Sequence, residues 1–87
     1  MIVFTEDQIN TPKFEKALEK SIYENLYVLD RRSNLTGKKY IAFFDVDART
    51  WANAAYHRNN GKPIQSSHYF LNSDERKFVL TGVPPGE

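Results

Sequence analysis

The sequence contains no cysteine, no long apolar run and no large excess of charge of either sign. Without cysteine the chain forms no disulfide, offers no thiolate for catalysis and holds no cysteine-ligated metal. No apolar run reaches the ~20 residues that cross a bilayer, and no signal-peptide pattern opens the chain. We therefore expect a cytoplasmic protein with no membrane partner.

The charge balance limits the partners that the chain can attract. There are 12 basic and 11 acidic residues, for a formal net charge of +1. This balance argues against a strong electrostatic partner such as duplex DNA or an anionic membrane. With 87 residues, of which 40% are hydrophobic and 26% charged, the composition predicts one globular domain over residues 1–87.

The segment 40–47, Tyr-Ile-Ala-Phe-Phe-Asp-Val-Asp, has the clearest strand pattern in the chain. Alternate residues of a strand point to opposite faces, and the first half of this segment is apolar on both. It is therefore predicted to be a central strand that is covered on each side. Residues 1–5, with the β-branched pair Ile2 and Val3, predict a further strand.

Two helices are predicted, one on each side of this strand in the chain. Thr11 and Pro12 supply a hydroxyl cap and a proline at the first helical position. Apolar residues then recur at three- and four-residue steps as far as Leu29, so the first helix is expected to end near residue 30 or 31. A polar, basic loop follows at 31–39. Asp47 can cap the second helix, which should end at Asn-Asn-Gly, residues 59–61.

The last third of the chain predicts a β-hairpin. Residues 63–71 and 77–82 have the composition of strands, and the five polar residues 72–76 would join them. The order is then strand, helix, strand, helix, strand, strand, and a right-handed crossover makes the first two strands parallel. The predicted fold class is α/β, with a central mixed sheet and helices packed on it.

This order and several local patterns resemble the thioredoxin-like family. In that family the first strand runs into a dithiol motif, Cys-x-Pro-Cys in many members, at the start of a helix. Here residues 9–13 are Ile-Asn-Thr-Pro-Lys, and Pro12 matches the family proline. Residues 44–47 look like the family's strand ending in Asp-Val-Asp, and Tyr56 falls where those proteins often carry a tyrosine. Residues 80–87 are similar to the glycine and Pro-Pro-Glu that lead into the family's last helix.

Three departures from the family pattern change what the resemblance implies. Asn10 and Lys13 occupy the two cysteine positions, so the dithiol chemistry is absent. Pro63 is the one candidate for the family's cis-proline, although spacing puts that position near Ser66 or Ser67. The chain also stops where the terminal helix would begin. The resemblance therefore implies a redox-inactive, thioredoxin-like domain with its terminal helix missing.

Such a domain implies a non-catalytic module that binds another protein, as a small inhibitor or adaptor, without a cofactor. In the family, partners are held where the dithiol motif, the cis-proline and nearby loops meet. Ile9 is apolar within a polar turn, and Lys13 opposes the helix dipole, as expected of recognition residues. Alternatively, Ile9 packs under the first helix as a hydrophobic staple. The expected partner-binding residues are Ile9, Asn10, Thr11, Pro12, Lys13, Pro63, Ser66 and Ser67.

Single-stranded nucleic-acid binding is an alternative function. Basic residues cluster at 31–39 and again at 49–62, among frequent aromatic residues that could stack on bases. The near-zero net charge argues for a solvated basic rim instead. Trp51 and Tyr56 lie on the apolar stripe of the second helix, where they are expected to belong to the core.

Metal-dependent phosphoryl chemistry is a weaker alternative. Asp45 and Asp47 share a strand face about 7 Å apart and could hold a divalent cation together. The chain lacks the further motifs of such enzymes, which favours a capping role for Asp47. His57 and His68 do not have the spacing of metal ligands. We therefore assign no catalytic residue and no metal ligand.

Overall fold

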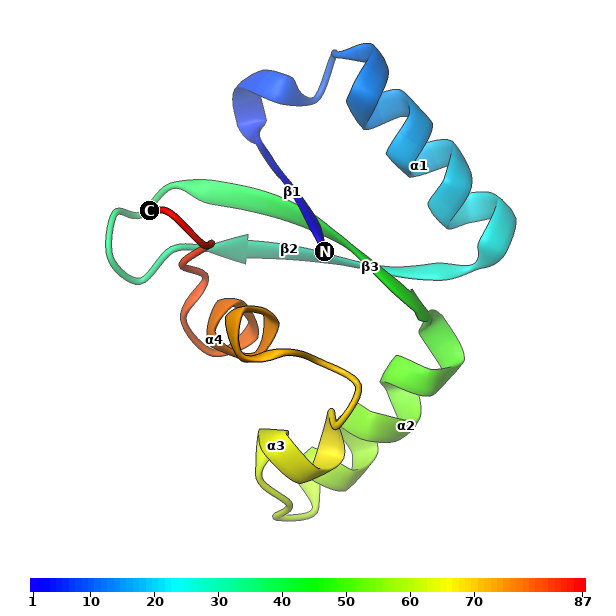
Figure 1. The fold of residues 1–87 in the computed structure, drawn as a ribbon, viewed down its shortest axis with the longest axis vertical. Helices are drawn as coiled ribbons and strands as arrows, with labels where there is room; N and C mark the ends of the chain where they lie inside the picture. Colours follow the sequence, from blue (N-terminus) through cyan, green and yellow to red (C-terminus); the bar gives the residue numbers. More distant parts are fainter.

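The computed structural model describes residues 1–87 as a small α/β domain built on a three-stranded sheet (Figure 1). The elements in chain order are β1 (Ile2–Thr5), the 3-10 helix η1 (Glu6–Gln8), α1 (Pro12–Glu24), β2 (Leu26–Arg32), β3 (Lys39–Asp47), α2 (Ala48–Asn59), α3 (Ile64–Ser67) and α4 (Ser73–Thr81). None of the α-helices has both the length and the apolar character needed to span a membrane.

The sheet has the order β1-β3-β2, which makes β3 the central strand, as the sequence predicts. Val3 and Leu29 both lie opposite Ala42, one on each side of β3, and both strand pairs are antiparallel. The prediction of a mixed sheet with a parallel first pair is therefore wrong. A crossover through α1 does link two parallel strands, but they are β1 and β2, and β3 lies between them.

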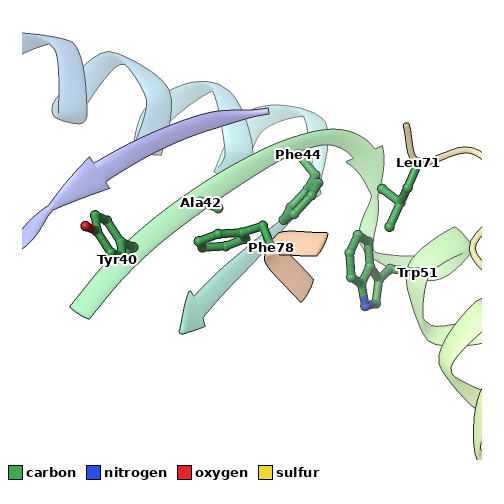
Figure 2. Close-up of a cluster of buried hydrophobic side chains, with 6 residues drawn as sticks. All are labelled: Tyr40, Ala42, Phe44, Trp51, Leu71 and Phe78. Carbon is green, nitrogen blue, oxygen red and sulfur yellow. The ribbon is translucent and has the colours of Figure 1, made fainter. Parts of the chain in front are cut away.

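The larger apolar cluster lies on the sheet face that α2 and α4 cover (Figure 2). Phe44 of β3 is only 1% exposed, and its ring lies 4.7 Å from that of Trp51 on α2. Trp51 also stacks on Tyr27 of β2 at 3.9 Å with an interplanar angle of 7°. Burial of Phe44 and Trp51 is thus confirmed. The buried members of this cluster are Tyr40, Ala42, Phe44, Trp51, Leu71 and Phe78.

The opposite face of the sheet carries a smaller cluster under α1. Phe4, Phe14 and Phe43 meet edge to face, with ring centroids between 5.3 and 5.7 Å apart. Ala17 and Ile41 pack against these rings. The two faces of β3 are therefore both covered, which confirms the prediction from its apolar pattern.

The first helix ends earlier than predicted. Asn25 adopts the left-handed conformation (φ 54°, ψ 46°), and its backbone N–H bonds the carbonyls of Ser21 and Ile22. The chain then continues as β2, in which Leu29 pairs with β3. The prediction failed because Leu26 and Leu29 fit a helical stripe equally well. Asparagine tolerates the left-handed region and can end a helix as glycine does.

The predicted C-terminal hairpin is also wrong, because residues 63–71 and 77–82 lie in and around the helices α3 and α4. Asn72 caps α4: its side chain accepts from the N–H of Glu75 at 2.9 Å, and Glu75 accepts from the N–H of Asn72 at 2.9 Å. This capping box uses the same polar residues that suggested a turn. Gly82 ends α4 in the left-handed conformation, as a helix C-cap commonly does.

The second helix is as predicted. The N–H of Thr50 donates to Asp47 Oδ1 at 2.7 Å, which confirms Asp47 as the cap of α2. This hydrogen bond to the backbone N–H of Thr50 lowers the pKa of Asp47. Residues 83–87 form no further helix and fold back on the β2–β3 connection, where Glu87 accepts from Ser33 Oγ at 2.7 Å and Thr36 Oγ1 at 3.0 Å.

Candidate functional site

The outer edge of β1 is not paired with another strand, because β1 is the first strand in the order β1-β3-β2. The N–H of Thr5 bonds the side chain of Gln8 at 2.9 Å, so it does not bond β3. Antiparallel strands alternate between residues that bond the partner strand and residues that face away from it. Val3, two residues before Thr5, therefore turns its N–H and C=O toward the open edge. An edge of this kind can accept one more strand.

A groove of about 420 Å³ runs beside this edge, between β1 and α1. Its apolar residues are Ile2 and Phe4 from β1 and Ala17 from α1. Ile2 is 57% exposed, although it lies on the same strand face as the buried Phe4. The groove thus exposes apolar surface directly next to unpaired backbone groups.

Three lysines from α1, Lys13, Lys16 and Lys20, complete the lining of the groove. Residues at i, i+3 and i+7 lie on one side of a helix. Phe14 and Ser21 are the buried residues of α1 and fix how the helix sits on the sheet. This orientation brings the three lysines alongside β1.

The groove carries positive charge without an acidic partner of its own. The two ion pairs of the structure are Met1 N with Glu75 at 3.3 Å and Lys39 with Asp30 at 3.0 Å, and neither involves a groove lysine. No acidic residue lines the groove. Asp45, with Lys20, lines a neighbouring hollow of about 230 Å³ on the same face of the sheet.

One half of the predicted binding site lies next to this groove. Ile9 follows η1 and is 36% exposed. Thr11 caps α1, its Oγ1 accepting from the N–H of Phe14 at 3.4 Å, and Pro12 is the first residue of the helix. Of the predicted residues 9–13, Lys13 is the one that lines the groove.

The other half of the predicted site lies elsewhere. Pro63 caps α3, which packs on α2 at the opposite end of the molecule from η1 and the start of α1 (Figure 1). Ser66 and Ser67 line a separate cavity of about 230 Å³ with residues of α2 such as His57. The structure therefore does not bring Pro63, Ser66 and Ser67 together with residues 9–13. The chain has no cis peptide bond, so Pro63 is trans.

Ser67 and His68 form a buried pair beside that cavity. Ser67 Oγ and His68 Nδ1 share a hydrogen bond of 2.8 Å, and His68 is 2% exposed. Burial lowers the pKa of His68, and the nearby positive charge of Arg58 lowers it further. The imidazole packs edge to face on Trp51 at 4.9 Å, and no carboxylate is hydrogen-bonded to it. The pair is part of the core around Trp51.

The basic residues near the β2–β3 connection are largely engaged within the chain. Arg31 bonds the carbonyls at the end of α4, Arg32 Nη1 bonds Gly37 O at 2.6 Å, and Lys39 pairs with Asp30. Trp51 is buried in the core, whereas Tyr56 is 66% exposed, contrary to its predicted core position. These contacts engage three of the four basic residues at 31–39, whereas Arg49, Arg58 and Lys62 of the second basic segment stay exposed.

Sequence reasoning missed most of this groove. Lys16 and Lys20 lie off the apolar stripe that predicts the first helix, and Ile2 is predicted only to lie in a strand. The lysine spacing of three and four residues could have indicated a continuous basic row. Its place beside an open strand edge depends on the strand order, which the sequence did not reveal.

No protein-family model, curated protein or solved structure matches this chain. The resemblance to the thioredoxin-like family therefore gains no support from comparison with known proteins.

Proposed function

We propose that the protein is a non-catalytic protein-binding module, acting as a small inhibitor or adaptor, and that it holds its partner at the α1–β1 groove. One observation carries the proposal. The open edge of β1, the exposed Ile2 and three lysines without acidic partners converge on one groove.

Each of these features costs stability or solubility when nothing covers it. Open strand edges and exposed apolar side chains favour unwanted association. The lysine row adds like-charge repulsion along α1. Local features that do not help folding tend to mark the surface that serves recognition. The proposal does not require a thioredoxin-like origin, since the groove follows from the antiparallel sheet and α1 alone.

The experiment is affinity capture from the native cell, followed by binding measurements with the purified partner. The test variant combines Lys16→Gln with Lys20→Gln, which removes two groove charges. The matched control combines Lys62→Gln with Lys77→Gln, two exposed lysines outside the groove. Both variants change the net charge from +1 to −1. We expect the groove variant to weaken binding by about tenfold and the control to bind like the wild type. Equal binding by both variants would place the partner surface elsewhere.

A further inference from the structure

We infer that the α1–β1 groove takes an acidic, extended peptide segment, which pairs with β1 as a fourth strand. This inference rests on the proposed function and specifies the chemistry of the partner. It combines the backbone groups of the β1 edge with the charge and apolar surface of the groove.

The backbone groups set the position of the segment. Val3 presents an unpaired N–H and C=O, whereas the N–H of Thr5 is already bonded by Gln8. A segment that adds to β1 therefore pairs at Val3 rather than at Thr5. Strand addition to an open edge takes its affinity from these main-chain hydrogen bonds and its specificity from alternate side chains.

The side chains of the groove set the composition of the segment. In an added strand, alternate residues would face α1 and lie about 7 Å apart. Lys13 and Lys20, the two ends of the lysine row, are seven residues apart along the helix, or about 10 Å. Two acidic residues with three positions between them lie about 14 Å apart on the groove side, and the long lysine side chains can close the difference. The middle residue between them faces the groove as well, and an apolar side chain there would cover Ile2 and Ala17.

A second copy of this chain is a poor occupant. Pairing β1 with β1 of another copy would bring two rows of Lys13, Lys16 and Lys20 to the same interface. Lysines beside an edge strand are a common protection against such pairing. Nucleic acid is also less well suited. The groove offers backbone groups that match a strand, and its one aromatic residue, Phe4, is 6% exposed and cannot stack on a base.

The probe is a fluorescent peptide of about nine residues, the length of a long strand. All its residues are threonine except a central valine and two glutamates, one placed two positions before the valine and one two positions after it. One control peptide has lysine in place of both glutamates. A second control carries N-methyl groups on alternate amides, which removes the donors that would pair with Val3. Binding is measured from the fluorescence anisotropy of the peptide as wild-type protein is added. The site is mapped from changes in the NMR chemical shifts of the protein's backbone amides.

We expect the acidic peptide to bind with a dissociation constant below about 1 mM. The amide shifts should centre on Val3 and on α1 near Lys16. The lysine peptide should not bind. N-methylation should weaken binding by about fivefold or more, as expected for a lost hydrogen bond. The Lys16→Gln, Lys20→Gln variant should bind about tenfold more weakly, and the Lys62→Gln, Lys77→Gln control should bind normally.

A variant of the protein tests the strand edge independently. Val3→Pro removes the N–H at the open edge, where proline is tolerated because that group bonds no neighbouring strand. It should weaken peptide binding by about fivefold or more, with little effect on affinity for simple anions such as phosphate. If this variant does not fold, the N-methylated peptide gives the same comparison from the ligand side.

Several outcomes would overturn the inference. One is no binding of the acidic peptide at about 1 mM. A second is equal binding of the N-methylated peptide, which would show charge attraction without strand pairing. A third is tighter, lysine-dependent binding of single-stranded oligouridylate. If the peptide fails while the captured partner still depends on Lys16 and Lys20, the strand chemistry is wrong and the proposed function stands. If the captured partner is insensitive to both lysines, the proposed function itself fails.

Discussion

Arg31 on β2 donates from Nη2 to the carbonyl oxygen of Leu80 at 2.8 Å, across 49 positions of sequence. Its Nε also donates to Val79 O at 3.3 Å. The carbonyls at a helix C-terminus lack partners within the helix, and they form the negative end of the helix dipole. A single guanidinium therefore joins the edge strand β2 to the end of α4.

Replacing Arg31 with alanine should lower the free energy of unfolding by about 1–2 kcal/mol, because two carbonyls lose a charged donor. Arg31→Lys should recover only part of this, since an ammonium cannot reproduce the fork of the guanidinium. Urea denaturation would measure both. Lys77→Ala, on the exposed side of α4, serves as the control. A loss no larger than that of the control would show that the Arg31 contacts do not stabilise the fold.

Phe44 should be among the most costly residues to truncate. It is 1% exposed and contacts both Trp51 and Tyr27. Phe44→Ala should cost roughly 3–5 kcal/mol through lost burial and the cavity left behind. A domain of this size has a typical total of about 5–15 kcal/mol, so the variant should be largely unfolded on warming. Thermal denaturation followed by near-ultraviolet circular dichroism, which reports on Trp51, provides the measurement. An unchanged melting temperature would contradict this account of the core.

The elements that could be predicted from sequence are those whose pattern has one interpretation. The central strand β3 has apolar residues on both faces, which suits a covered strand and no amphipathic helix. Asp47 followed by the apolar stripe of α2 is an unambiguous helix start. In both cases the local pattern and the final packing agree, except at Tyr56, which the stripe places in the core and the structure leaves 66% exposed.

The elements that could not be predicted have patterns with two interpretations. Leucines at 26 and 29 continue a helical stripe, yet they also fit a strand once Asn25 turns the chain. Asn72 and the polar residues after it are common both in turns and at helix starts. The choice depends on which alternative buries more apolar surface against the rest of the chain. That is a tertiary effect, and it also determines that Lys16 and Lys20 lie beside an open strand edge.

Gly82 should not tolerate a side chain. Its φ is +74°, and a Cβ there would lie 2.2 Å from the carbonyl oxygen of Arg32. Gly37 provides a matched control, because its φ is +76° and a Cβ at that position would have nothing within 4 Å. Gly37→Ala should therefore show only the left-handed penalty of about 1–2 kcal/mol. Gly82→Ala should cost a further ~1–3 kcal/mol from overpacking. Equal losses in the free energy of unfolding would show that β2 and the end of α4 can move apart.

The stability of the protein should depend on pH through His68. Burial among Trp51 and Phe70, aided by the positive charge of Arg58, holds the pKa of His68 below its ordinary value of 6.5. Between the folded pKa and 6.5 the unfolded chain binds more protons than the folded chain, so the free energy of unfolding must rise with pH in that window. The stabilisation should be complete above about pH 6.5 and should fall as the pH drops toward the folded pKa.

The measurement is the free energy of unfolding at several pH values between about 5 and 7.5, a range chosen to bracket the ordinary histidine value. His68→Phe should remove the slope, because phenylalanine keeps an aromatic ring against Trp51 but does not titrate. His57→Phe is the control, because it makes the same substitution at a half-buried histidine away from Trp51. His68→Phe also leaves the Ser67 hydroxyl without its partner, so its overall stability should be lower at every pH. The decisive quantity is thus the slope rather than the absolute stability. A slope that persists unchanged in His68→Phe would show that His68 does not cause the pH dependence.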